Sequence, residues 1–134
     1  MEYFYLFRIA LRLNRFLFTH AGVTKWWADK YKINEPYVER DINHLFQTNP
    51  KVFNDVGMVR GGWSKTGSPV WADISEHESF PLFSMNYIQI FGHSQQTKES
   101  FICKDGKLIC LDCRKLFVLE DEKVNEYKDL AIVP

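Results

Sequence analysis

Apolar residues gather in short runs, and each run ends at a polar or glycine-containing turn. Residues 16–19 and 86–91 are mostly aliphatic or aromatic, which predicts two buried strands. His20 follows the first strand, and His93 follows the second after a single glycine. Ligands commonly gather beyond the carboxyl ends of strands in open α/β folds. We therefore expect both imidazoles at one edge of a sheet.

Two helices are predicted between these strands. Thr24 is a suitable cap for a short helix that extends to about Tyr31, and Pro36 suits the first turn of a second helix. Asn49 and Pro50 would end the second helix. Its buried face is indicated by apolar residues at i, i+4, i+7 and i+8, namely Val38, Ile42, Leu45 and Phe46.

The remaining chain predicts one long loop and a hairpin. Residues 57–69 read GMVRGGWSKTGSP, which is long for an idle connection, so we expect this loop to border a site or to act as a flap. Asp105-Gly106 separates residues 100–103 from 107–111, a strong hairpin signal. Residues 115–119 would add a further antiparallel strand.

Length and composition indicate a single globular domain over residues 1–134. The chain is 46% hydrophobic, and its 17 basic residues balance its 17 acidic residues without forming a basic stripe. Nucleic-acid binding is therefore not expected. Three arginines interrupt the apolar residues 1–18, so we expect a strand or a buried helix there and no membrane span.

The three cysteines suggest reduced thiols and a cytoplasmic location. Cys110 and Cys113 form a C-x-x-C spacing, and Cys103 lies across the predicted hairpin. A zinc or redox site is the alternative to buried strand cysteines, but the spacing lies within predicted strand and has no fourth zinc ligand.

Histidines at two strand ends suit a zinc, manganese or iron site, because a sheet can hold both imidazoles at fixed angles. The alternative is two unrelated histidines that form hydrogen bonds near the strand ends. Position alone slightly favours the second interpretation. His77, within the charged segment SEHES, is expected to face solvent, and His44 is expected on the surface of the second helix.

Four short motifs, in order, resemble those of calcineurin-like metallophosphoesterases of the serine/threonine protein phosphatase-like branch. His20-Ala21-Gly22 resembles the late His-Ala-Gly motif, and Gly92-His93 resembles the final Gly-His motif. Between them, residues 67–73 (GSPVWAD) resemble the Pro-x-Trp segment, and residues 105–113 resemble the closing hairpin and its last strand. The resemblance covers residues 16–119.

The resemblance implies an α/β (α+β) fold, the C-terminal half of a four-layer sandwich with a mixed sheet, helices on one side and a C-terminal β-hairpin. It also implies hydrolysis of phosphate esters at divalent metal ions (manganese, iron or zinc), with His20 and His93 as ligands of the same ion. Gln95 occupies the place where many members have another histidine.

The motifs Asp-x-His, Gly-Asp-x-x-Asp and Gly-Asn-His of this family do not occur in the chain. No catalytic residue is therefore assigned, and the metal site is incomplete in this partial domain. We expect a separately encoded N-terminal half or a second copy of the chain as partner. The alternative is a non-catalytic interaction module or an inactive remnant of the same fold.

Two further residues are candidates for binding the phosphate-ester substrate. The guanidinium of Arg60 in the glycine-rich loop matches phosphate oxygens, although most loop arginines are simply solvated. Trp71, together with Trp63, is a candidate wall of a substrate groove, although aromatic residues near such loops commonly pack the loop down.

Overall fold

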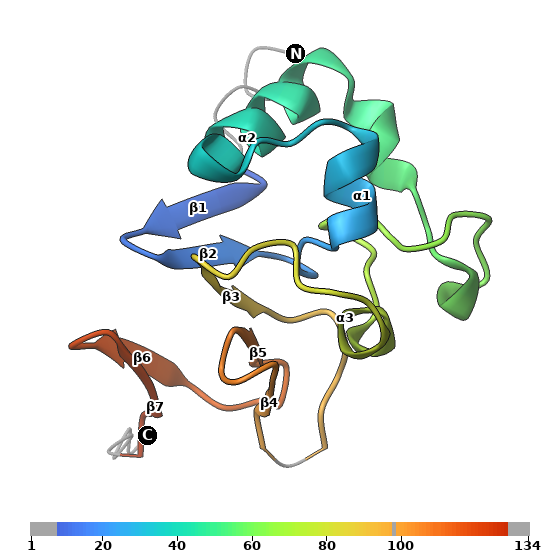
Figure 1. Ribbon diagram of the computed structural model, residues 1–134. Helices are drawn as coiled ribbons and strands as arrows, with labels where there is room; N and C mark the ends of the chain where they lie inside the picture. Colours follow the sequence, from blue (N-terminus) through green and yellow to red (C-terminus); the bar gives the residue numbers. More distant parts are fainter. Residues whose placement is uncertain (1–7, 98, 129–134) are drawn as a thin grey trace, which may run out of the picture.

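A mixed sheet of five strands organises the protein in its computed structural model, which describes residues 8–97 and 99–128 (Figure 1). The strand order is β1-β2-β3-β5-β4, with β2, β3 and β5 parallel and the two outer strands antiparallel to their neighbours. The strands are β1 (Ala10–Leu13), β2 (Phe16–Thr19), β3 (Ile88–Phe91), β4 (Phe101–Cys103) and β5 (Leu108–Cys110). The mixed sheet of the sequence prediction is thus confirmed.

The helices pack on one face of this sheet. They are α1 (Lys25–Lys30), α2 (Val38–Thr48) and α3 (Ile74–Ser79), with short 3-10 turns η2 (Glu35–Tyr37), η3 (Pro50–Asn54) and η4 (Met58–Arg60). Leu17 of β2 lies in one buried cluster with Trp27 of α1 and Ile42 of α2. Phe91 of β3 and Ile74 of α3 belong to a second cluster. Helices on one side of the sheet were predicted.

Strand pairing brings five apolar residues into one row on the opposite face. Because side chains alternate between the two faces of a strand, paired residues of neighbouring strands share a face. Leu11 and Ile102, at the ends of the row, are 51% and 58% exposed, whereas Ile90 at its centre is buried. The row consists of Leu11, Phe18, Ile90, Ile109 and Ile102.

Local signals explain the helix ends. The Thr24 hydroxyl accepts a hydrogen bond from the amide of Trp27 at the start of α1. Pro36 lies in η2, directly before α2, and Asn49 ends α2. α3 begins with a capping box, in which Asp73 caps the helix and the Glu76 carboxylate accepts from the Asp73 amide. The first two helices agree with the prediction, whereas α3 was not predicted.

Asn43 joins α2 to the edge strand β1. Its side-chain oxygen accepts hydrogen bonds from the amides of Ile9 (2.8 Å) and Ala10 (3.0 Å), and its amide donates to the Ala10 carbonyl (2.8 Å). The next residue, His44, is exposed on α2 as expected. One buried side chain therefore satisfies three backbone groups of the edge strand.

The C-terminal segment corrects one prediction. β6 (Phe117–Glu120) does not extend the main sheet but pairs with β7 (Lys123–Glu126) in a separate two-stranded sheet. The β4–β5 hairpin was predicted correctly, and β7 was not predicted. Residues 8–18 include β1 and the start of β2, while the rest of the predicted N-terminal element lies outside the described residues. No helix in the described part of the chain is long and apolar enough to cross a membrane.

Candidate functional site

Two imidazoles meet at the carboxyl edge of the parallel strands. His20 follows β2, His93 follows β3, and Nε2 of His20 lies 3.0 Å from Nδ1 of His93. The segments are joined by a hydrogen bond from the Gly92 amide to the His20 carbonyl (2.9 Å). The two residues are 73 positions apart in the chain. The sheet thus brings together the two histidines singled out from the sequence.

His93 lies at a sharp backbone turn. Its φ angle is +68°, and the amide of Ser94 donates to the Gly92 carbonyl across it (2.8 Å). This three-residue turn is rare for a residue with a side chain and costs about 1–3 kcal/mol. The turn directs the imidazole toward His20, and such strain is typical of functional sites.

The separation of the two nitrogens suits two ligands of one ion. Imidazole nitrogens bound at about 2.0–2.1 Å, with an angle of about 90–110° between them, lie about 2.9–3.4 Å apart. His93 Nε2 is buried without a hydrogen-bond partner among the described residues. The same distance is that of a hydrogen bond between the two rings, so the pair fits either such a hydrogen bond or two positions of a metal shell. No group of three or more His, Cys, Asp or Glu side chains in the described residues could hold an ion.

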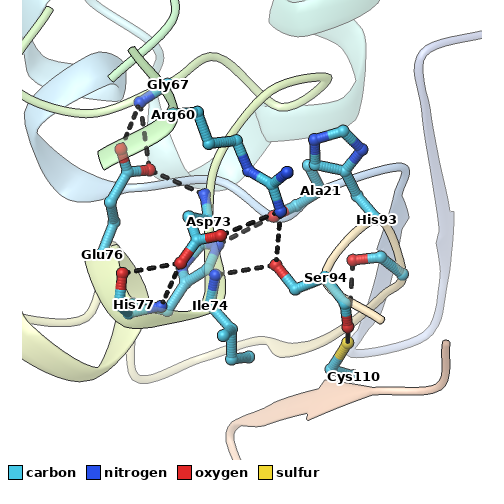
Figure 2. A network of polar contacts seen from close by, with 12 residues as sticks. Ala21, Arg60, Gly67, Asp73, Ile74, Glu76, His77, His93, Ser94 and Cys110 are labelled. Carbon is cyan, nitrogen blue, oxygen red and sulfur yellow. Dashed lines mark hydrogen bonds and ion pairs between the residues drawn. The ribbon is translucent and has the colours of Figure 1, made fainter. Parts of the chain in front are cut away.

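Arg60 of η4 lies near His93, in the polar network of Figure 2. Its Nη2 forms an ion pair with Oδ1 of Asp73 (2.9 Å) and donates to the hydroxyl of Ser94 (3.2 Å). The same hydroxyl accepts from the Ile74 amide (2.8 Å) at the start of α3. Arg60 Nε has no hydrogen-bond partner among the described residues. The loop that was expected to border a site therefore brings a guanidinium to it.

The charges of this network favour a neutral His93. Burial lowers the pKa of His93, and the nearby positive charge of Arg60 lowers it further. Burial by itself raises the pKa of Asp73, but hydrogen bonds from Ser75 and the charge of Arg60 outweigh it, so the net shift is downward. A neutral imidazole keeps a free lone pair, which is the form that binds metal ions.

Trp71 lies next to His93, with the two rings edge to face and their centroids 5.7 Å apart. It is 39% exposed, so part of its ring is open to a ligand. Trp63 is 99% exposed, so its side chain does not pack the glycine-rich loop against the fold. An open pocket beside the histidines is lined by residues that include Phe18, Ile90 and Asp112.

The structure overturns the expectation for His77. Its side chain is only 4% exposed, and Nε2 lies 2.8 Å from the carbonyl oxygen of Ala21. Its neighbour Glu76 is also buried, where its carboxylate accepts from the Gly67 amide (3.1 Å). Burial lowers the pKa of His77 and raises that of Glu76. Helix α3 thus buries Glu76 and His77, although the charged sequence around them is typical of a surface segment.

The cysteines behave as buried thiols. All three are free; Cys110 and Cys113 are buried, and Cys103 is half-buried. Cys110 Sγ donates to the Ser94 carbonyl at 3.3 Å, and burial raises its pKa. These thiols have the character of packing residues and not of an activated nucleophile.

Comparison with known proteins supports the fold but names no family. No protein-family model matches the chain, and no curated protein sequence matches it. A crystal structure of a mutant cold-active protein tyrosine phosphatase aligns with a TM-score of 0.53 at 17% identity. The alignment covers 89% of this chain but only 40% of that phosphatase. The likeness shows that the chain shares its fold with part of that protein.

Proposed function

We propose that the chain is part of a metal-dependent phosphoester hydrolase of the calcineurin-like kind, and that His20 and His93 are ligands of one divalent metal ion. The observation that carries this proposal is the 3.0 Å approach of His20 Nε2 to His93 Nδ1 at the edge of a phosphatase-like sheet. A bound divalent ion in such a centre supplies Lewis-acid stabilisation of the phosphoryl oxygens and activates a water molecule.

The chain's own residues contribute binding and orientation. His20 and His93 each direct one imidazole nitrogen toward the ion. Arg60 is fixed by Asp73 and Ser94 through Nη2 and has its Nε buried, so it presents the N–H groups of Nη1 to the phosphate oxygens. Trp71 forms a wall beside His93 for the ester group. These roles explain why a glycine-rich loop is tied to the sheet edge.

The remaining ligands come from a partner. Two imidazoles alone do not complete a shell of four or more ligands with negative charge, and no third ligating group joins them among the described residues. The partner is a separately encoded N-terminal half of the domain or a second copy of the chain. The partly exposed apolar row on the helix-free face, with Leu11 and Ile102 at its ends, gives either one a surface.

Sedimentation velocity distinguishes the two partners. If a second copy binds the apolar row, the wild-type chain forms dimers, and the Leu11→Lys, Ile102→Lys double variant is monomeric. A matched variant with lysine at exposed Gln47 of α2 should leave the dimer intact. A monomeric wild type at high concentration would leave only the complementary half as partner.

The catalytic proposal is tested by manganese-dependent hydrolysis of p-nitrophenyl phosphate. His20→Ala and His93→Ala should each abolish the manganese-stimulated rate, and His44→Ala, an exposed histidine on α2, should keep it. Arg60→Ala should raise KM more than it lowers kcat if the guanidinium contacts the phosphate already in the ground state. A stimulated rate that survives both strand-end alanine variants would refute the metal assignment.

A second candidate function is a non-catalytic interaction module or inactive remnant of the same fold. The absence of a three-ligand group in the described residues favours it. In that case, neither the chain nor its complex with a partner hydrolyses the aryl phosphate, and no divalent ion is retained.

A further inference from the structure

The loop that carries His20, residues 20–23, is held by hydrogen bonds to six of its backbone groups. The partners come from four parts of the fold: β3 with the residue after it, the turn before α3, helix α3 itself and β2. The His20 carbonyl accepts from the Gly92 amide (2.9 Å), and the Ala21 amide donates to the Pro69 carbonyl (2.7 Å). The Ala21 carbonyl lies 2.8 Å from His77 Nε2, and the Gly22 amide donates to the Thr19 hydroxyl (2.9 Å). The side-chain amide of Gln89 accepts from the Val23 amide (2.7 Å) and donates to the Val23 carbonyl (3.1 Å).

Among these contacts, His77 alone uses a side chain of α3. Its ring packs on Phe91 with centroids 4.8 Å apart. On its other side it fills the space beside Gly22, where an added Cβ atom would lie 2.5 Å from His77 Nε2. Gly22 has φ +86°, so glycine is favoured there on both counts. The imidazole thus packs against both the loop that carries His20 and the last residue of β3.

The partner atom defines the protonation state of His77. A backbone carbonyl oxygen only accepts hydrogen bonds, so Nε2 must carry the proton and donate to Ala21. Burial favours the neutral ring and lowers its pKa. His77 is therefore a neutral imidazole with its proton on Nε2.

One side chain consequently touches both segments that carry the paired histidines. Ala21 is adjacent to His20, and Phe91 lies two residues before His93. The close approach of the two histidines depends on the relative position of these segments. A shift of either segment changes the separation of the two nitrogens.

We propose that His77 is a positioning residue for the histidine pair: its Nε2–H holds the Ala21 carbonyl while its ring supports Phe91, which fixes the spacing of His20 and His93. This role rests on the proposed metal-binding function but makes predictions of its own for the metal-free chain. The role is mechanical, because His77 itself would not touch metal or substrate.

The test compares His77→Phe, which keeps an aromatic ring but loses the donor, with His77→Gln, which keeps a donor. Nuclear magnetic resonance of the metal-free chain reports the ring-to-ring proton contact between His20 and His93 and the exchange rate of the Gly92 amide. We expect His77→Phe to lose the contact and to speed Gly92 exchange at least tenfold, and His77→Gln to restore most of both. The Ala10 amide, bound to Asn43, is the internal control for global unfolding.

Cobalt(II) affinity gives the second readout. Outer partners of metal ligands typically contribute 10–100-fold to affinity, so His77→Phe should bind cobalt at least tenfold more weakly than His77→Gln. If the dimeric wild type binds no cobalt, the metal proposal fails, and the positioning role is then decided by the ring-to-ring proton contact.

Two results would overturn the positioning role. One is a folded His77→Phe variant with an unchanged ring contact and unchanged Gly92 exchange. The other needs no variant: nitrogen-15 spectra of the wild type that place the His77 proton on Nδ1 would remove the hydrogen bond to Ala21, even if His77→Phe does not fold.

Discussion

Gly22 is a position at which the loop that carries His20 tolerates no side chain. It combines φ +86° with a His77 ring 2.5 Å from an added Cβ atom. Gly106 has a similar φ of +78° but nothing within 4 Å. Gly22→Ala should therefore cost about 2–4 kcal/mol of unfolding free energy, and Gly106→Ala about 1 kcal/mol. Urea unfolding measures both values.

Gly106→Ala isolates the backbone strain, so the difference between the two variants reports the steric conflict with His77. Equal losses would show that the ring does not occupy the space beside Gly22.

His77 also makes stability depend on pH. Burial lowers its pKa in the folded chain below the value of about 6.5 in the unfolded chain, so the unfolded chain binds a proton first as pH falls. Stability is then complete above about pH 6.5 and declines on acidification by up to about 1.4 kcal/mol per pH unit. His77→Gln removes this part of the decline.

The measurement is urea unfolding of wild type and His77→Gln between pH 7.5 and 5. Glu76, with a pKa raised by burial, and His93, with a pKa lowered by burial, titrate in both proteins and largely cancel in the difference. Parallel curves for the two proteins would contradict a buried, neutral His77.

At the level of elements, Asn43 ties α2 to β1. Asn43→Ala leaves the part-buried amide of Ile9 and the buried amide and carbonyl of Ala10 without their partner, which should cost about 2–4 kcal/mol. Gln47→Ala, an exposed change on the same helix, should cost less than about 0.5 kcal/mol. Thermal unfolding of the two variants tests this; similar melting temperatures would show that α2 does not hold the edge strand.

Four strands of the main sheet (β2, β3, β4 and β5) were predictable because each has a local signature. Apolar runs indicated β2 and β3, and Asp105-Gly106 indicated the β4–β5 hairpin. β6 was detected but assigned to the wrong sheet, because a short half-buried strand carries no information about its partner. Its true partner, β7, lies in a charged segment with a weak apolar pattern.

The site was predictable only in part. His20 and His93 follow recognisable strands, and Arg60 and Trp71 lie in segments with strong local features. His77 escaped detection because its contact with Ala21 spans 56 residues and its own segment is charged. Asp73 signals a helix start, since Glu76 follows three residues later, but this capping pattern does not reveal which face the helix buries.

At the scale of the whole molecule, the chain resembles part of a larger protein. It corresponds to 40% of the phosphatase with which it aligns, carries two clustered histidines, and has a partly exposed apolar row on one sheet face. These three features are related if a partner packs on that face and adds ligands at its edge. The sequence predicted a partner from the missing motifs, but it did not indicate a surface for one, because the row forms only when the strands pair.

The most direct test of this interpretation is a titration of the chain with cobalt(II), followed by its visible absorption. We expect wild type and His44→Ala to bind one cobalt ion per site with the same affinity, and His20→Ala and His93→Ala to lose at least tenfold in affinity. Equal cobalt binding by all four proteins, or none by the wild type even when dimeric, would contradict the proposal that His20 and His93 form a metal-binding pair.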